Sequence, residues 1–471
     1  MSLIGIAAGA AGAWGLSYGL SRFGREPAQP PQLYEYYLDN YWFKSAGFAT
    51  QLINPPLKGS RKADIVILGG GFTGLASAYH LIQKFPDRKI VLLEGACCGY
   101  GASGRNGGFV DTRVPGLSHY TEKAGPEKGR HAFDISLYGI NLIKQLVAEH
   151  GLDCEFEENG SLVTAMDDKQ ARALEHECRI FKAMGLDASV IQGTELQTEI
   201  KSPRYIAGMT FPYTGIVNPY KLARGMKALV EDMGVEVLER TVVMRFTPGR
   251  LHRIETEMGD IEAPDVVLGL NGYSAKLGLF KNRVIPVCSY VVATEPLTET
   301  QWESIGWQNR QGVNDLRASF DYLRPTLDGR IVIGGTDYPY YADDQLSSGN
   351  NKPVIAALTN DLFATFPQLE GLRIEHAWGG TMGFSYDFTP SVGQMGEYQN
   401  IYYGVAHNGE GVGNCQTAGR IIADLMAAEP SELTKLYYVN HKIPWAGPQK
   451  LRIIPARIYK WYAQRWGVTS H

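Results

Sequence analysis

The sequence has few cysteines, and no two of them have the spacing of a metal-binding or redox motif. The six lie scattered along 471 residues, as Cys97, Cys98, Cys154, Cys178, Cys288 and Cys415. No pair has CxxC spacing, and the adjacent Cys97 and Cys98 are poor partners for a disulfide. This pattern favours a reducing compartment and offers no cysteine cluster to hold a metal.

An excess of basic residues is also lacking. Lysine and arginine number 45 against 49 aspartates and glutamates, for a net charge of −4, so nothing suggests a nucleic-acid partner. We also find no Ser/His/Asp constellation. Glycine, by contrast, is abundant at 54 residues, as a protein that wraps a phosphorylated cofactor with its backbone would need. The length and a hydrophobic content of 44% predict about two globular domains.

The most informative stretch is ADIVILGGGFTG, residues 63–74, where an apolar strand runs into a glycine turn and a helix begins near Thr73. In this pattern Gly69 makes the turn, Gly71 lets a pyrophosphate approach the backbone, and Gly74 lets the helix pack on the strand. The helix N-terminus would bind the phosphates. A second apolar strand ends in Glu94, where a carboxylate would accept hydrogen bonds from ribose hydroxyls. The alternative is a purely structural glycine turn.

The first 25 residues form a predicted membrane anchor. Residues 2–20 carry no charge, and as a helix they would extend about 28 Å, close to a bilayer core of roughly 30 Å. Two Gly-xxx-Gly spacings would let another copy or a membrane partner pack closely. Arg22 and Arg25 follow, so the positive-inside rule places the globular body on the cytoplasmic side. The alternative is a buried or disordered glycine-rich tail.

Two further segments flank the globular body. Residues 26–61 are rich in proline and then in aromatic residues, and we interpret them as an extended arm whose aromatic side chains pack at the surface. Residues 431–471 interleave lysine and arginine with tryptophan and tyrosine, as segments that bind the lipid interface of an anionic membrane do. The alternative for this basic aromatic tail is a solvated amphipathic segment.

Strand and helix patterns between these ends predict a discontinuous domain with a second domain inserted. The nucleotide-binding domain is expected at residues 62–150, 206–281 and 393–430, and the strand-rich second domain at 151–205 and 282–392. Helices are expected at 129–150, 170–184, 219–233 and 411–428. The loop at 99–113, GYGASGRNGGFVDTR, has so few side chains that its backbone could approach something flat or charged.

Nine blocks spread over residues 36–430 resemble one family. They are ADIVILGGGFTGLASAYHL, GASGRNGGF, ENGSLVTA, GIVNPYKLARGM, DVVLGLNGYS, PVCSYVVATEPL, LRPTLDGRIVIGG, DFTPSVG and NGEGVGNCQTAGR. The chain resembles the D-amino-acid-oxidase-like (DAO) superfamily of FAD-dependent amine and amino-acid oxidoreductases, most closely the branch with γ-glutamylputrescine oxidoreductases. The resemblance implies an α/β plus α+β fold of the glutathione-reductase-like, DAO type. FAD would lie in the Rossmann-like domain, and the substrate under a mixed sheet of the other domain.

The resemblance also implies which residues hold FAD. Those at the pyrophosphate and ADP ribose are Gly69, Gly71, Phe72, Thr73, Gly74 and Glu94. Those that line the flavin side are Ala102, Ser103, Arg105, Asn106, Gly107 and Gly108. The backbone of Val243 would meet the adenine, and Asn271, Gly272 and Tyr273 would close the far side. At the flavin's pyrimidine end stand Gly409, Gly411 and Val412, where the dipole of the last helix would stabilise negative charge.

The chain departs from the family pattern near the last glycine turn. The usual Gly-His-Gly is Gly409-Glu410-Gly411 here, and Gly413 stands where sarcosine oxidases carry a lysine that grips the substrate carboxylate. The cysteine to which sarcosine oxidases attach flavin has no counterpart in GGTMGFSYDF. We therefore expect non-covalent FAD and do not carry over a sarcosine-like mechanism in detail.

In this family the flavin takes a hydride equivalent from the carbon next to a neutral amine, which leaves an imine, while the protein orients the substrate and excludes water. The candidate substrate contacts are His407, Glu410, Arg324 and Tyr322, with Trp378 as a wall. Arg324 would hold a carboxylate or form a structural ion pair. His407 or Glu410 would attract or deprotonate the amine, although Glu410 could instead be a carboxylate stabilised by the helix dipole.

Two kinds of function remain open from the sequence. The first is an amine or amino-acid oxidoreductase at the cytoplasmic membrane face that passes electrons to a quinone. Its substrate would be a γ-glutamylated polyamine, a cyclic imino acid or an N-methyl amino acid, with the resemblance favouring the first and N-methylglycine ranked last. The alternative is a flavoprotein that assists the assembly of a membrane complex and turns over no amine itself.

Overall fold

The computed structural model describes residues 40–48, 52–111, 116–317, 320–335, 351–448 and 452. The predicted membrane anchor at 1–25, much of the predicted arm and most of the C-terminal tail lie outside these residues. No helix within the described ranges has the length and apolar character needed to cross a membrane. This finding does not test the predicted N-terminal anchor, because residues 1–25 lie outside the described ranges.

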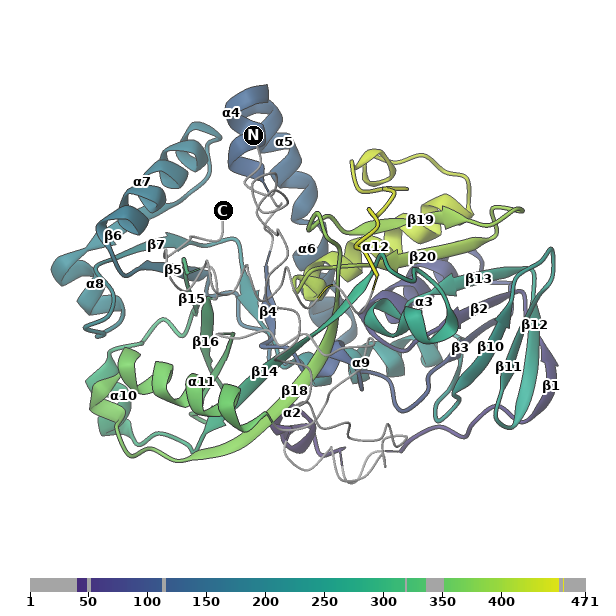
Figure 1. The fold of residues 1–471 in the computed structure, drawn as a ribbon, viewed down its shortest axis with the longest axis horizontal. Coiled ribbons are helices and arrows are strands. Elements are labelled where there is room, and N and C mark those ends of the chain that lie inside the picture. Colours follow the sequence, from purple (N-terminus) through teal and green to yellow (C-terminus); the bar gives the residue numbers. More distant parts are fainter. Residues whose placement is uncertain are drawn as a thin grey trace, which may run out of the picture. The chain divides into compact units, whose positions relative to one another are not determined.

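A six-stranded sheet forms the centre of the nucleotide-binding domain (Figure 1). Its order is β19-β20-β13-β2-β3-β9. The strands are β2 (Ile65–Leu68), β3 (Ile90–Leu93), β9 (Glu236–Leu238), β13 (Asp265–Leu268), β19 (Ser391–Met395) and β20 (Ile401–Val405). Neighbours are parallel except β19 and β20. All residues of β2 are buried, as a continuous apolar run predicts for a parallel strand covered on both faces.

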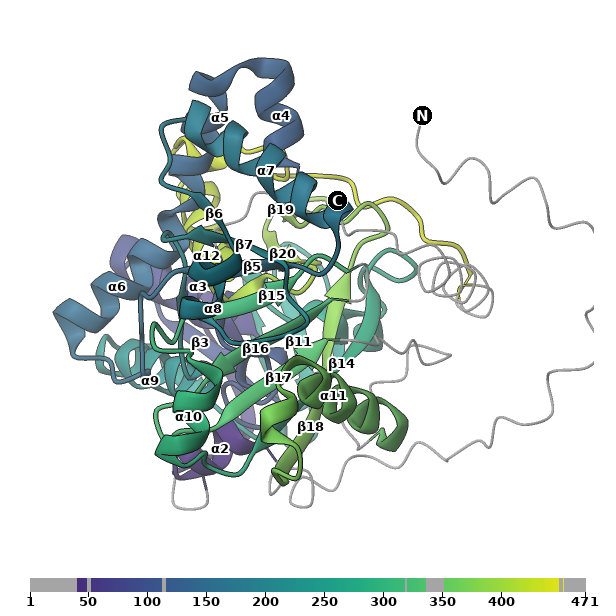
Figure 2. The ribbon, with the colours of Figure 1, turned by 90° about the vertical axis from the view of Figure 1, so that its left-hand side faces the viewer.

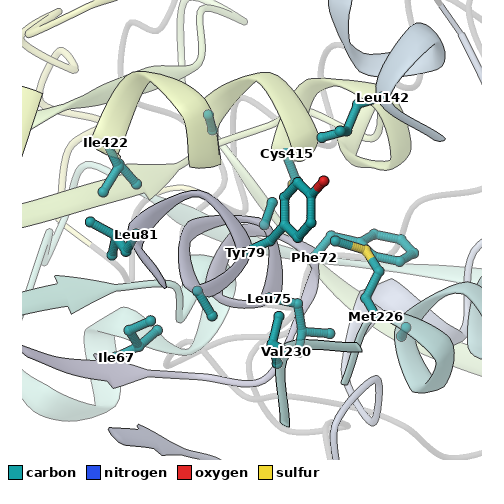
Figure 3. Packing of buried hydrophobic residues seen from close by; sticks show 14 of the residues in the cluster. Ile67, Phe72, Leu75, Tyr79, Leu81, Leu142, Met226, Val230, Cys415 and Ile422 are labelled. Carbon is teal, nitrogen blue, oxygen red and sulfur yellow. The ribbon is translucent and has the colours of Figure 1, made fainter. Parts of the chain in front are cut away.

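Three helices pack on this sheet, α3 (Phe72–Lys84), α9 (Pro219–Asp232) and α12 (Gly411–Met426), and α6 (Tyr138–His150) packs on α12. Figure 3 shows side chains of α3 meeting those of α9 and α12 in one cluster. Helix α9 begins as predicted, because Asn218 Oδ1 accepts a hydrogen bond from Lys221 N and Pro219 occupies the first turn. The helix predicted at 129–150 is two helices, α5 (Pro126–Ser136) and α6, separated at Leu137.

An eight-stranded mixed sheet forms the second domain, in the order β18-β14-β17-β16-β15-β5-β7-β6. Its strands are β5 (Ser161–Ala165), β6 (Ser189–Gln192), β7 (Ala207–Phe211), β14 (Ile285–Thr294), β15 (Gly312–Asp315), β16 (Asp321–Pro325), β17 (Ile331–Gly335) and β18 (Ile374–Phe384). Only β15 and β5 pair in parallel within this sheet. Helix α7 (Asp168–Ala183) packs on β5, β6 and β7, and α11 (Lys352–Thr365) packs on β14 and β17 (Figure 2).

Smaller elements complete the described fold. A four-stranded sheet contains β1 (Gly59–Lys62), β10 (Val243–Thr247), β11 (His252–Thr256) and β12 (Gly259–Ala263), and β4 (Phe109–Val110) pairs with β8 (Gly215–Ile216). The remaining α-helices are α2 (Tyr41–Ser45), α4 (Leu117–Ala124), α8 (Gly193–Glu199) and α10 (Glu299–Ile305). Short 3-10 helices are η2 (Ala102–Gly104), η3 (Asn271–Leu277), η5 (Pro367–Leu369) and η6 (Leu433–Lys435).

The six-stranded sheet contains strands from all three predicted parts of the nucleotide-binding domain, and the strand pairing differs from two of the predicted limits. The boundary predicted at residue 206 would place β7 in that domain, whereas β7 pairs with β5 and β6 in the eight-stranded sheet. The arm predicted at 26–61 overlaps β1, which pairs in parallel with β12. Both differences come from pairing between strands far apart in the sequence, which local patterns do not reveal.

The interpretation of the arm's aromatic residues as surface packing is wrong for α2. Trp42 and Phe43 are fully buried, and Tyr41 is only 4% exposed. These three side chains share a cluster with Tyr220 of α9 and Trp378 of β18. Helix α2 is therefore enclosed by the nucleotide-binding domain on one side and by strands of the second domain on the other.

Candidate active site

The first glycine turn joins β2 to α3. A Cβ added at Gly74 would collide with the carbonyl oxygen of Gly69, so that only glycine fits where the helix crosses the strand. Helix α3 begins after Gly71 without a side-chain cap. Phe72 N donates to Ser103 Oγ at 2.9 Å, and the other amides of this first turn lie at the positive end of the helix dipole. The turn thus has the local geometry of a phosphate site.

Glu94 lies at the end of β3, beside this turn. Its Oε2 accepts a hydrogen bond from Gly70 N at 2.7 Å, and its Oε1 accepts one from Ala96 N at 2.9 Å. Burial raises the pKa of Glu94 to about 6, against the opposite effect of these backbone donors. Thr241 N donates to Glu94 O at 2.8 Å, which brings the segment leading to Val243 next to Glu94, on the side where the adenosine is expected.

The second glycine-rich segment, residues 102–108, is a tightly bonded loop that we call the flavin loop. Asn106 Oδ1 accepts from Gly108 N at 2.7 Å, and Asn106 Nδ2 donates to the carbonyls of Ala102 (2.9 Å) and Ser103 (3.1 Å). The indole of Trp378 donates to Arg105 O at 2.8 Å. The side chain of Asn106 therefore shapes the loop, which leaves backbone groups rather than this amide for any cofactor contact.

The glycines of the flavin loop are needed for packing against the protein itself. A Cβ at Gly107 would lie 2.6 Å from the ring of Tyr322, and one at Gly108 would collide with Val217 O and lie 2.7 Å from Arg324 Nη1. The sequence predicted that a loop with few side chains lets its backbone approach something flat or charged. The structure supplies protein groups of both kinds, a tyrosine ring and a guanidinium.

The third glycine turn, residues 406–411, connects β20 to α12 with unusual backbone angles. Ala406, Asn408 and Gly409 have φ values of 58°, 54° and 95°. Left-handed angles at non-glycine residues cost roughly 1–3 kcal/mol each and cluster at functional sites. The turn is held by Asn271, whose Oδ1 accepts from Ala406 N at 3.0 Å, and by Ser385, whose N donates to Asn408 Oδ1 at 2.9 Å.

His407 joins this third turn to the first. Its Nε2 lies 3.1 Å from Thr73 Oγ1 in the first turn of α3. The side chain is 4% exposed, and burial lowers its pKa to about 4, so the ring is neutral at neutral pH. Together with the bond from Phe72 to Ser103, this contact brings all three glycine segments to the N-terminus of α3. The three segments that the resemblance assigns to one FAD thus lie together in the structure.

Tyr322 and Arg324 lie two residues apart on β16 and therefore on one face of the strand, toward the flavin loop. Arg324 is fully buried. Its Nε donates to Pro325 O at 2.9 Å, its Nη1 donates to Val217 O, and its guanidinium lies 5.0 Å from the ring of Trp42. Burial lowers its pKa to about 10. No ion pair of Arg324 is found among the described residues, so the structural ion pair considered from the sequence is replaced by bonds to main-chain carbonyls.

The other two candidates have different surroundings. Glu410 occupies the N-cap position of α12 and is partly exposed, and its side chain does not cap the helix. Trp378 is 2% exposed and donates to the flavin loop, so it supports the loop from behind rather than forming an open wall.

Sequence reasoning missed α2 as part of the site. Trp42 Nε1 donates to Asn106 O at 2.8 Å, and Asn40 Nδ2 donates to Gly104 O at 3.2 Å. The run Asn-Tyr-Trp-Phe is visible in the sequence, and three consecutive aromatic residues after a capping residue were the available signal. Nothing local indicated what they would pack against.

Comparison with known proteins agrees with this geometry. The model of the DAO family, FAD dependent oxidoreductases, matches residues 64–425. The chain belongs to this family. γ-Glutamylputrescine oxidoreductase of Escherichia coli strain K12 is 29% identical over 402 residues, covering 84% of this chain and 91% of that protein. A probable oxidoreductase OrdL of Haemophilus influenzae is 27% identical over 410 residues, covering 85% and 91%. The glycine oxidase structure from Geobacillus kaustophilus matches the fold with a TM-score of 0.68 and 18% identity, over 81% of this chain and all of that one.

As a member of the DAO family, the protein is an FAD-dependent enzyme that oxidises an amine or amino acid. The residues present fit this cofactor. Buried polar atoms that have no partner within the described ranges include Arg105 Nη2, His407 Nδ1 and Asn408 Nδ2, all in or beside the flavin loop and the third turn. Buried polar groups normally have partners, so these atoms are available to a bound group. The roles of individual residues toward FAD remain predictions of the resemblance.

Proposed function

We propose that this enzyme oxidises a γ-glutamylated polyamine at a carbon bonded to nitrogen, to an imine that hydrolyses to a carbonyl. The observation that carries the proposal is how Arg324 is used. The Nε and Nη1 atoms of this buried guanidinium donate to main-chain carbonyls and the group lies against a tryptophan ring, so that only Nη2 has no partner among the described residues. Glycine at 413 takes the place of the carboxylate-gripping lysine of sarcosine oxidases. A bidentate grip of Arg324 on an α-carboxylate beside the flavin is thereby disfavoured, because Nε and Nη1 already donate to carbonyls. An amine whose carboxylate lies far from the reacting carbon is favoured.

The charges around the third turn suit a cationic amine. Glu410 is partly exposed at the start of α12, where its carboxylate can attract an ammonium group. His407 carries no positive charge at neutral pH, because burial lowers its pKa to about 4, and so it does not repel the amine. FAD, when bound, supplies the acceptor for the hydride equivalent. Side chains packed beneath the flavin loop, the partly buried Tyr322 among them, fill the space on that side of the loop.

The proposed substrate class is also supported by relatedness. The relative that is 29% identical over most of both chains is named γ-glutamylputrescine oxidoreductase. Glycine oxidases also occur among the curated relatives, at 22% and 23% identity. We therefore place amino acids whose carboxylate lies next to the reacting amine, such as glycine and N-methylglycine, after the polyamine conjugates.

A panel of substrates added without oxygen to the purified holoenzyme tests this proposal. We expect γ-glutamylputrescine to bleach the visible flavin band faster and at lower concentration than proline, glycine or N-methylglycine. Putrescine itself is the matched control for the γ-glutamyl group, because it has the same reacting end. Faster bleaching by proline, glycine or N-methylglycine, in which the carboxylate lies next to the reacting amine, would contradict the proposal.

We further propose that the enzyme body lies at the cytoplasmic face of a membrane and passes electrons to a quinone. This rests on the uncharged run at 2–20 with Arg22 and Arg25 behind it, and on the basic aromatic segment at 431–471. Turnover with a soluble quinone, compared with oxygen uptake in the same preparation, tests the acceptor. Efficient peroxide formation without quinone reduction would contradict a quinone acceptor, and recovery of the full chain in the soluble fraction would contradict the membrane location.

A further inference from the structure

Helix α2 precedes every motif of the nucleotide-binding domain in the sequence, yet it lies directly behind the flavin loop. The helix is short, Tyr41–Ser45, and Asn40 caps it by accepting a hydrogen bond from Trp42 N. Asn40, Trp42 and Phe43 are fully buried. A five-residue helix has little stability of its own, so its position is set by what it contacts.

Helix α2 and its capping residue contact three consecutive residues of the flavin loop, 104–106. Asn40 Nδ2 donates to Gly104 O at 3.2 Å, and Trp42 Nε1 donates to Asn106 O at 2.8 Å. The ring of Phe43 fills the space under Gly104, where an added Cβ would lie 3.0 Å from it. The guanidinium of Arg105 stands 5.1 Å from the centre of the same ring. Helix α2 therefore covers the protein side of most of the loop.

A second tryptophan, from the other domain, completes this support. Trp378 of β18 donates its indole N–H to Arg105 O at 2.8 Å. The rings of Trp42 and Trp378 meet edge to face, with centroids 6.2 Å apart. Arg324 of β16 covers the ring of Trp42 at 5.0 Å. Two consecutive carbonyls of the loop, at residues 105 and 106, are thus held by two indoles that touch each other.

We propose that Trp42 is a positioning residue for FAD, and that it acts with Trp378 to hold the flavin loop in its binding conformation before the cofactor arrives. Without an indole donor, the partly buried carbonyl of residue 106 would lose its partner, and the loop would rotate to find another donor. Binding of FAD would then have to order the loop, and this cost would weaken the affinity for FAD. This inference rests on FAD binding and on the placement of the flavin beside residues 102–108, and it is independent of the substrate.

The substitution Trp42→Phe tests the proposal, because it removes the indole donor and keeps an aromatic ring. A matched control is Trp307→Phe. Trp307 is also 2% exposed or less and donates its indole N–H to a carbonyl, Gln311 O at 3.0 Å, but it belongs to the core of the second domain. Both variants lose one indole–carbonyl bond, which is partly buried at Trp42 and buried at Trp307. We expect similar small losses of thermal stability in the two apoproteins.

The expected difference is in the cofactor. In titrations of apoprotein with FAD, Trp42→Phe should raise the Kd about five- to tenfold, the effect of one buried hydrogen bond, and should alter the circular dichroism of the bound flavin. Trp307→Phe should change neither. Because the two indoles hold adjacent carbonyls, Trp42→Phe combined with Trp378→Phe should weaken FAD binding by a factor different from the product of the single effects.

Equal FAD affinity and equal flavin spectra in Trp42→Phe, Trp307→Phe and the unchanged protein would overturn the proposal. If Trp42→Phe does not fold, FAD binding is measured in Asn40→Ser instead. Serine can still cap α2 but cannot reach Gly104 O. Weaker FAD binding in that variant supports the proposal, and unchanged binding overturns it. These titrations contain no amine, so their outcome is separate from that of the substrate panel.

Discussion

The flavin loop and the third glycine turn differ in how closely the rest of the protein bonds to them and packs against them. The flavin loop is bonded on its protein side by Trp42, Trp378 and its own Asn106, and side chains fill the space beside its glycines. The third turn has left-handed angles at Ala406 and Asn408, and buried polar atoms of the turn have no partner within the described ranges. The backbone of the flavin loop is therefore positioned in advance, with Arg105 Nη2 left without a partner among the described residues, while the third turn keeps backbone strain together with its own unpartnered polar atoms.

The largest effect should come from two glycines with similar backbone angles and different surroundings. Gly108→Ala adds a methyl group that collides with Val217 O at φ +78°, whereas Gly409→Ala adds one whose nearest neighbour, Phe384 Cζ, is 3.9 Å away at φ +95°. We expect Gly108→Ala to lower the free energy of unfolding by roughly 4 kcal/mol, from left-handed strain and overpacking together. Gly409→Ala should lower it by only about 1–2 kcal/mol, from the strain alone. Thermal unfolding of both apoproteins measures this.

The same pair separates stability from cofactor binding. Gly409→Ala should weaken FAD binding by a larger factor than its small stability loss suggests, because Gly409 lies in the strained turn. Equal losses of stability in Gly108→Ala and Gly409→Ala would contradict the view that the flavin loop is packed more closely than the third turn.

An intermediate effect is expected for His407 at acid pH. Its pKa is about 4 in the folded protein and about 6.5 when unfolded. Between these values the unfolded chain binds the extra proton, so stability falls as the pH falls, by about 2 kcal/mol at pH 5. His407→Gln should remove this part of the acid sensitivity, while His131→Gln, at an exposed position, should not. Thermal midpoints of apoprotein at pH 7 and pH 5 measure it. His80, whose pKa burial also lowers to about 4, should keep part of the acid sensitivity in both variants.

The smallest effect concerns Arg324, on the filled side. Lysine keeps the charge but cannot reproduce the two directed bonds to Pro325 O and Val217 O or the contact with Trp42. We expect Arg324→Lys to lower stability by about 1–2 kcal/mol and to leave the ratio of KM values for γ-glutamylputrescine and putrescine unchanged. A rise of KM for γ-glutamylputrescine alone, which carries a carboxylate, would indicate that Arg324 binds the substrate carboxylate.

Local spacing predicted the first turn, Glu94 and the capped start of α9, because each depends on residues close together in the sequence. The support of the flavin loop could not be predicted in this way. Trp42 and Trp378 donate hydrogen bonds to carbonyls 64 and 273 residues away in the sequence. A run of aromatic residues has the same sequence pattern whether its side chains are exposed or buried. The use of Arg324 was open for a similar reason, since a strand pattern does not say whether a buried arginine meets a carboxylate or a carbonyl.

The most direct measurement is the amount and release of flavin from the purified protein. If three glycine segments converge on one non-covalent FAD, the native protein is yellow, releases one FAD per chain when denatured, and loses its visible band when γ-glutamylputrescine is added without oxygen. A colourless protein that takes up no added FAD would contradict this convergence.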